Sequence, residues 1–178
     1  MPTKGEEATM AIEIPLTQGK VALIDEEDFD LVTGYRWHTR KHGGKYYAQA
    51  TVRLDNGMQT TIKMHRLIFG LSDPKTHTDH INGDGLDNRR ENLRAASCAQ
   101  NQYNRGAQVN NKSGYKGVYW DRRRGKWVAT IKVNRKTNYL GCHATPKAAH
   151  MAYCKAAIEM HGEFCNFGAL ESGQKKGP

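Results

Sequence analysis

The sequence lacks the features of membrane, secreted and zinc-finger proteins. No apolar run approaches the roughly 18 residues that a transmembrane helix needs, so we expect no membrane partner. Residues 1–10 include Glu6 and Glu7 but no apolar segment, so they do not resemble a secretory signal. The 4 cysteines are widely spaced without a Cys-x-x-Cys pair, which argues against a zinc site of the usual spacing. These absences favour an intracellular protein with reduced thiols.

Acidic residues are scarce in the C-terminal part of the chain. Residues 1–104 contain 13 basic and 14 acidic side chains, whereas residues 105–178 contain 14 basic and 4 acidic ones. The net formal charges of the two parts are therefore −1 and +10. A basic segment interleaved with Trp and Tyr is typical of a polyanion-binding surface. A chain of 178 residues allows one domain or two small ones, and we expect a chemical half followed by a binding half.

Turn and cap residues predict an α+β protein of short elements. Asp25 is expected to cap a helix over 26–33 that ends at Gly34. Asp55-Asn56-Gly57 is a strong hairpin turn. Strands are expected at 12–16, 20–24, 36–39, 46–52 and 59–63, a short helix at 64–70, and a later helix starting near Ser97. The expected domain boundaries are a disordered leader 1–11, a region 12–104, a linker 105–112, a domain 113–168 and a flexible tail 169–178.

The segment Thr78-Asp79-His80-Ile81-Asn82-Gly83-Asp84 carries residue types suited to phosphodiester hydrolysis. A histidine that is partly neutral near pH 7 can deprotonate water. Asp79 and the amide oxygen of Asn101 are the oxygen ligands that a divalent cation prefers. Asn92 can hold either a backbone carbonyl or the His80 ring, and Arg89, Arg90 and Arg94 are suited to phosphate contact.

These residues, with the run Asp79 to Arg94, resemble the HNH endonuclease motif of phage homing enzymes in its His-Asn-Asn form. The resemblance covers about residues 46–104, with the motif at 65–104, and implies a ββα-metal finger behind an N-terminal β-rich extension. It implies that His80 is the general base, that Asn92 orients it, and that Asp79 and Asn101 bind the metal. Asn101, where some members have His, favours Mg²⁺, with Mn²⁺ as a substitute. Asn88 and Asn104 are alternatives for the two Asn roles.

Other interpretations of the motif are a plain turn and a calcium loop. The calcium loop is disfavoured because no Glu follows at the twelfth position. We expect His65 to have a packing role and His77 to be a loop residue. The N-terminal region could add a DNA contact through Arg36, Arg40, Lys41 and Lys45.

Residues 113–168 predict three strands followed by a helix that starts at Thr145-Pro146 and stops at Gly162. Ser113 to Trp120, Gly125 to Ala129, Tyr139-Leu140-Gly141 and His161 to Phe164 resemble the Apetala/ethylene-response-factor type DNA-binding domain. The resemblance implies a small three-stranded antiparallel sheet, packed on one helix, that enters the major groove. Alternation places Lys126, Val128, Thr130 and Lys132 on one face and Trp127, Ala129, Ile131 and Val133 on the helix side. The expected DNA-binding residues are Lys116, Trp120, Arg122, Arg123, Arg124, Lys126, Lys132, Arg135 and Lys136.

The sequence therefore predicts a metal-dependent DNA endonuclease of the homing type, without a small-molecule cofactor, in the cytoplasm of a bacterial host. We expect a monomer that nicks one strand of double-stranded DNA, whereas a double-strand break would need a dimer or successive cuts. A non-catalytic DNA-binding regulator is the alternative, and an RNA nuclease is disfavoured because A-form RNA fits such a sheet poorly.

Overall fold

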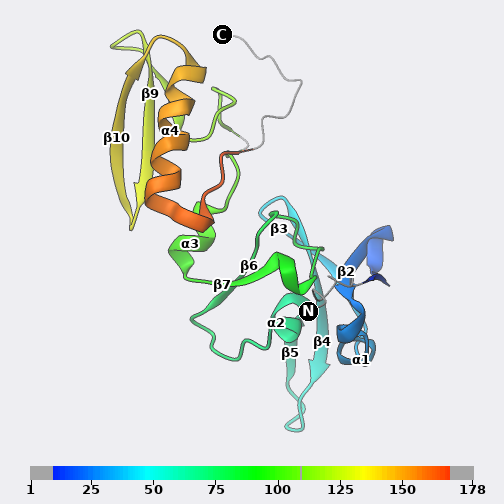
Figure 1. Cartoon of the computed structure of the whole chain (residues 1–178). Helices are drawn as coiled ribbons and strands as arrows, with labels where there is room; N and C mark the ends of the chain where they lie inside the picture. The colour runs from blue at the N-terminus through cyan, green and yellow to red at the C-terminus, as the bar shows by residue number, and fades with distance from the viewer. Residues whose placement is uncertain (1–9, 109, 169–178) are drawn as a thin grey trace, which may run out of the picture. The chain divides into compact units, whose positions relative to one another are not determined.

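The computed structural model describes residues 10–108 and 110–168, which form two compact units divided between Ala95 and Ala96 (Figure 1). Small antiparallel sheets and short helices confirm the mixed α+β class. Within the described ranges, no helix has the length and apolarity to cross a membrane. The expected tail, and the expected leader apart from Met10 and Ala11, lie outside the described residues.

The first unit contains two small sheets and two short helices around one apolar core. β1 (Ala11–Pro15) pairs with β2 (Val21–Asp25), and β3 (His38–His42), β4 (Lys45–Arg53) and β5 (Gln59–Lys63) form an antiparallel sheet in that order. The helices are α1 (Phe29–Thr33), preceded by the 3₁₀ turn η2 (Glu26–Asp28), and α2 (Met64–Phe69). Gly70 ends α2 in the left-handed conformation with φ 68°, which glycine adopts at no steric cost. The core residues are Ala22, Ile24, Val32, Trp37, Ala48, Ala50, Met64, Ile68 and Leu93.

Asp25 occupies the predicted N-cap position, but the expected side-chain cap is missing. The Asp25 side chain makes no cap hydrogen bond to its helix, and its Oδ2 instead accepts from the backbone N–H of Arg90 at 2.7 Å. The Arg90 N–H therefore takes the place of the N–H groups at the start of this short helix as the hydrogen-bond donor to the Asp25 carboxylate.

The central motif forms a two-stranded sheet of β6 (His77–His80) and β7 (Leu93–Ala96), joined by a loop over 81–92. β2 holds this loop from outside the motif. The Leu23 N–H donates to the Leu86 carbonyl, and the Asn88 N–H donates to the Leu23 carbonyl, both at 2.8 Å. The N-terminal β-rich region therefore braces the loop that follows His80.

The helix after β7 belongs to the second unit. α3 (Cys98–Tyr103) starts at Ser97, whose side chain forms the capping box with Gln100. The Tyr103 ring stacks on His161 with centroids 3.9 Å apart, and its hydroxyl accepts from the Asn134 N–H at 3.0 Å. Both ends of the expected linker 105–112 therefore lie in the same compact unit, and its described residues contain no helix or strand.

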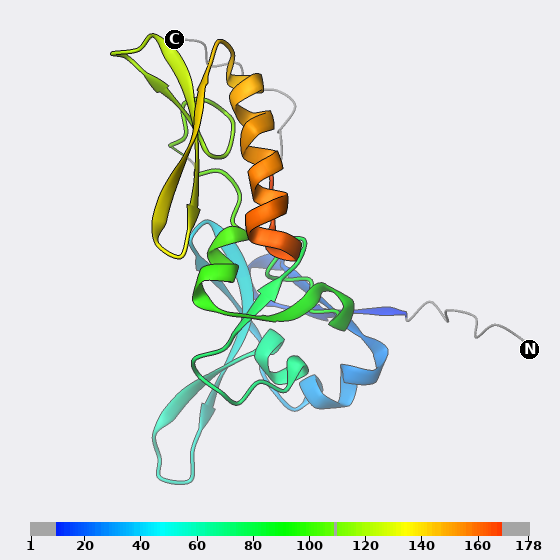
Figure 2. The same ribbon diagram turned by 60° about the vertical axis from the view of Figure 1, so that its left-hand side comes forward.

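The second unit contains a three-stranded antiparallel sheet of β8 (Val118–Asp121), β9 (Lys126–Val133) and β10 (Lys136–His143), with β9 in the centre. α4 (Pro146–His161), capped by Thr145, lies along one face of it, and η4 (Gly162–Phe164) follows (Figure 2). A Cβ at Gly117 would lie 2.1 Å from the Tyr153 ring, so only glycine allows this close approach. The helix-facing side of β9 packs as predicted. Val128, expected on the open face, is fully buried between its strand neighbours Tyr119 and Cys142.

Candidate active site and nucleic-acid interface

His80 ends β6 with its ring held by Asn88. His80 Nε2 lies 3.2 Å from Asn88 Oδ1, and Asn88 Nδ2 donates to the Leu86 carbonyl at 3.1 Å. Because a backbone carbonyl can only accept, it fixes the orientation of the Asn88 amide. Oδ1 therefore faces the imidazole, Nε2 carries the hydrogen, and Nδ1 carries the lone pair of the neutral ring.

Two rings pack against His80 and keep it in a largely dry environment. His65 lies edge-on with ring centroids 5.0 Å apart, and Tyr47 lies 6.0 Å from His80. Burial lowers the pKa of His80, although the hydrogen bond that His80 donates to Asn88 opposes the shift. A neutral imidazole near pH 7 can accept a proton, as a general base must.

His65 has a packing role beside His80. Burial, with a smaller contribution from the charge of His80, lowers the pKa of His65 to about 3. Its Nδ1 is buried without a hydrogen-bond partner in the described structure. His65 therefore remains neutral and supports the ring of His80.

Asn92 holds the loop rather than the ring. Its Oδ1 accepts from the Asn82 N–H at 2.9 Å, and its Nδ2 donates to the Asp87 carbonyl at 2.7 Å. Asn92 was expected to hold either a backbone carbonyl or the His80 ring, and in the structure it holds the backbone carbonyl of Asp87. The contact with His80 belongs to Asn88, which was an alternative because several Asn residues stand close together in the sequence.

Asp79 is buried and paired with Arg94. Arg94 Nε and Nη2 both donate to Asp79 Oδ2, at 2.9 and 2.8 Å, and the two side chains are 13% and 5% exposed. Asp79 and His80 belong to the first unit, whereas Asn101 lies on α3 in the second. Within residues 10–108 and 110–168, no three His, Cys, Asp or Glu side chains gather as a metal site. A carboxylate oxygen and an amide oxygen are each of the kind that Mg²⁺ takes, but these two expected ligands belong to different units.

The other two arginines of the motif also pair with carboxylates. Arg89 contacts Asp87 through Nε at 2.9 Å and Nη2 at 2.8 Å, which holds the pKa of Asp87 below its usual range. Arg90 Nη2 lies 2.6 Å from Asp28, whose side chain is 1% exposed. The three arginines expected at phosphates therefore bind carboxylates of the chain itself.

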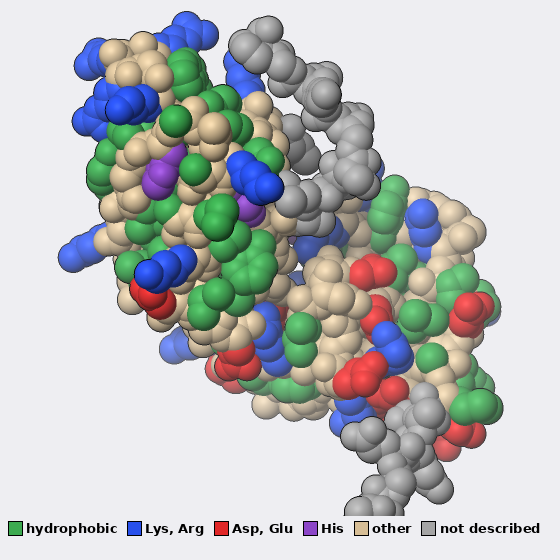
Figure 3. Space-filling view, turned by 45° about the horizontal axis from the view of Figure 1, so that its top comes forward, with side chains coloured by type: hydrophobic (Ala, Val, Ile, Leu, Met, Phe, Trp, Pro, Cys, Tyr) green, Lys and Arg blue, Asp and Glu red, His purple; other side chains and the backbone are tan. Residues whose placement is uncertain are grey.

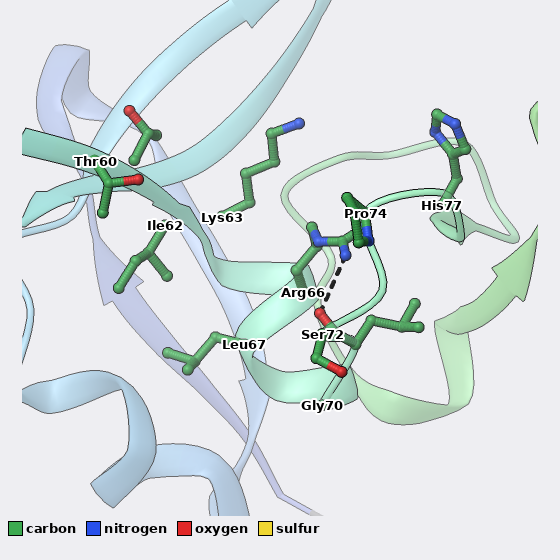
Figure 4. Close-up of a pocket in the computed structure, with 11 residues that line it drawn as sticks. Thr60, Ile62, Lys63, Arg66, Leu67, Gly70, Ser72, Pro74 and His77 are labelled. Carbon is green, nitrogen blue, oxygen red and sulfur yellow. Dashed lines mark hydrogen bonds between the residues drawn. The ribbon is translucent and has the colours of Figure 1, made fainter.

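A hollow of about 800 Å³ opens between β5 and α2, but it is separate from His80 (Figure 4). Its lining includes Lys63, Arg66 and His77, but neither Asp79 nor His80. The Arg66 guanidinium donates to the carbonyls of Leu71 and Thr76 and so holds the wall of the hollow. This hollow therefore does not define the candidate active site.

The open face of the C-terminal sheet is basic and aromatic. Strand register places Lys126 and Lys132 on the same face as Tyr119 and Tyr139, and all four are exposed. Lys and Arg side chains gather at one end of this unit (Figure 3). The turn residues Arg122, Arg123, Arg124, Arg135 and Lys136 are exposed as well.

Two residues expected at DNA lie elsewhere. Lys116 Nζ donates to the carbonyls of Tyr103 at 2.6 Å and Asn166 at 2.9 Å, and burial lowers the pKa of Lys116 to about 8. Trp120 pairs across the strands with Trp127, with centroids 5.1 Å apart, so its ring lies on the helix side of the sheet. Neither position can be read from the local sequence, since each depends on a partner from a distant segment or strand.

Comparisons with known proteins find a family match in the second unit and related proteins of viral origin. Residues 113–163 match the AP2 domain family, which implies a DNA partner. Protein 3.8 of Escherichia phage T7 is 30% identical over 91 residues, covering 51% of this chain and 74% of that protein. A protein of Acanthamoeba polyphaga mimivirus, described as an uncharacterized HNH endonuclease, is 26% identical over 152 residues, covering 83% of this chain and 74% of its own length. No solved structure matches the chain.

Proposed function

The chain belongs to the family of phage T7 protein 3.8, and from this premise we propose that it is a metal-dependent DNA endonuclease of the HNH homing type. The observation that carries the proposal is the buried His80 ring, held through Nε2 by Asn88 and next in the chain to Asp79. The similarity to a viral HNH protein supports the reaction, and the AP2 domain supports duplex DNA as the substrate. The phage relative supports action in the cytoplasm of a bacterial host.

His80 acts as the general base in this proposal. Nδ1 takes a proton from a water molecule, and the resulting hydroxide attacks the phosphorus of a backbone phosphate. The bond to the 3′ oxygen breaks and this leaving oxygen takes a proton from solvent water, which leaves a 5′-phosphate and a 3′-hydroxyl. Asp79 would be a ligand of Mg²⁺, or of Mn²⁺ as a substitute, and the bound ion would supply positive charge for the developing negative charge. Arg94 orients Asp79 through its two hydrogen bonds to Oδ2.

The AP2 unit selects the DNA in this proposal. Lys126 and Lys132 on the sheet face and the basic turns on either side approach the backbone and the base edges. Tyr119 and Tyr139, exposed at 49% and 57%, supply flat apolar area on the same face. As one protomer carries one His80, a monomer would nick one strand.

One observation favours a non-catalytic DNA-binding regulator as the second candidate. The Asp79 carboxylate is ion-paired with Arg94, and His80 is only 6% exposed. A regulator would keep this arrangement when bound to DNA, whereas a nuclease must open it to water and a phosphate.

Supercoiled plasmid distinguishes the two functions. With Mg²⁺, the wild-type protein should convert it to the nicked form, and EDTA should stop the reaction. DNA ligase should then reseal the product, because hydrolysis leaves a 5′-phosphate beside a 3′-hydroxyl. Binding in a mobility-shift assay without any Mg²⁺-dependent nicking would support the regulator and reject the nuclease.

A further inference from the structure

A lysine from the β3–β4 hairpin lies on the His80 side of the first unit. Lys45 is the first residue of β4 and pairs with His42 across the hairpin. Strand alternation places Lys45 on the same face as Tyr47, whose ring packs against His80. Lys45 therefore projects from the sheet face that supports the candidate base.

The loop after His80 is pressed onto this face of β4. A Cβ at Gly85 would lie 2.4 Å from the Tyr46 carbonyl and 2.5 Å from the Tyr47 ring, so the loop backbone touches the strand. A Cβ at Gly83 would lie 3.1 Å from Lys45 Nζ, so the ammonium group sits against the same loop.

Lys45 differs from the three arginines of the motif in its ion pairing. Arg89, Arg90 and Arg94 are ion-paired with carboxylates, whereas Lys45 has no ion pair among the described residues. The nearby acid Asp84 accepts a hydrogen bond from the Leu86 N–H within its own loop. As a whole residue, Lys45 is half-buried, and its charge is available to an anion.

We propose that Lys45 binds a backbone phosphate of duplex DNA next to the phosphodiester bond that the water activated by His80 hydrolyses. An ammonium beside the His80 loop and a DNA strand carrying one charge per nucleotide are complementary. This inference rests on the proposed function, because it deepens the substrate contact of the same site. It assigns phosphate binding in the first unit to a residue outside the HNH motif.

The same hairpin supplies a matched control. Lys41 was expected at DNA together with Lys45, but it pairs with Tyr46 and so lies on the face away from Tyr47 and His80, with Nζ 5.4 Å from the centre of the Tyr46 ring. Lys41→Met and Lys45→Met remove the same charge from neighbouring strands. Only Lys45→Met removes it from the His80 side.

The test is the salt dependence of DNA binding by the full-length protein in EDTA, on a duplex that spans the cut region. Losing one phosphate contact lowers the slope of log affinity against log salt by about 0.9. When salt rises from 0.05 to 0.2 M, the DNA affinity of Lys45→Met should therefore fall by a factor about 3.5-fold smaller than the factor for wild type. Lys45→Arg should restore the wild-type slope, and Lys41→Met should keep it. Equal slopes for Lys45→Met and wild type, or equal losses for both Met variants, would overturn the proposal.

A parallel nicking assay separates this inference from the function on which it rests. If wild type nicks plasmid but Lys45→Met leaves the binding slope unchanged, only the Lys45 assignment fails. If wild type never nicks with Mg²⁺, the nuclease assignment fails, and a lowered slope would still assign Lys45 to DNA binding by a regulator.

Discussion

Replacing Asn88 by alanine should change which nitrogen of His80 carries the proton. In the wild type, the Leu86 carbonyl fixes the Asn88 amide, so its oxygen accepts from His80 Nε2. Without that acceptor, the ring loses its preference for hydrogen on Nε2, and the other tautomer becomes populated. The pKa of His80 should fall further, because the bond to Asn88 is a contribution that raises it.

The size of the effect follows from burial. Asn88 is 0% exposed, so alanine removes its hydrogen bonds to His80 and to the Leu86 carbonyl. The Leu86 carbonyl keeps its bond from the Leu23 N–H, whereas buried His80 Nε2 loses its Asn88 partner. At about 1 kcal/mol for each bond, and about 1 kcal/mol or more for a buried group left unpaired, the first unit should lose about 2–4 kcal/mol. Since a general base contributes about 10²–10⁴-fold, misplacing its lone pair should slow nicking by about 10²-fold.

Nitrogen NMR of histidine-labelled protein without metal reports the tautomer and the pKa directly. Hydrogen exchange over residues 77–95 reports the stability of the first unit separately from the second. Asn92→Ala is the matched control, since Asn92 bonds to Asn82 and Asp87 but makes no hydrogen bond to His80. It should lower stability without changing the His80 tautomer. A wild-type His80 with its hydrogen on Nδ1 would refute the role of Asn88. Equal changes of the His80 tautomer and pKa in Asn88→Ala and Asn92→Ala would refute it as well.

Three further changes test the packing. His65→Gln should remove part of the acid sensitivity of the first unit. The pKa of His65 in the folded protein is about 3, below the ordinary 6.5, so wild type loses stability as pH falls below 6.5. If the urea midpoint of the variant depends on pH as that of wild type does, His65 is not the cause. Arg90→Met leaves buried Asp28 without its ion-pair partner and should destabilise that unit by about 3 kcal/mol in urea unfolding; a loss under about 0.5 kcal/mol would mean that the pair is solvated. Tyr103→Ala removes the stack on His161 and should destabilise the second unit by about 2 kcal/mol, with faster hydrogen exchange in α3; unchanged exchange would show that α3 is held otherwise.

Local signals in the sequence predicted the local structure well. The hairpin at 55–57, the Ser97 cap and the Thr145-Pro146 helix start each depend on residues within a few positions, and each is present. The helix side of β9 followed from alternation, because a two-residue period leaves no other choice for a strand that packs on one face. The α+β class followed from the same short-range patterns.

Partners from distant segments could not be predicted. Arg90 meets Asp28 across 62 positions, and Lys116 meets Asn166 across 50, so neither ion pair nor hydrogen bond leaves a local pattern. The choice between Asn88 and Asn92 at His80 depends on the path of the loop, which β2 fixes from outside the motif. The residue types of the candidate site were therefore readable, but their pairings were not.

The most direct measurement compares two histidines of the same strand. Single-turnover nicking of plasmid with Mg²⁺ should be about 10²–10⁴-fold slower for His80→Ala than for wild type, because the base for water is lost. His77→Ala, which changes an exposed histidine at the start of β6, should keep the wild-type rate. Equal rates for His80→Ala and wild type, at equal DNA binding, would contradict the assignment of His80 as the general base.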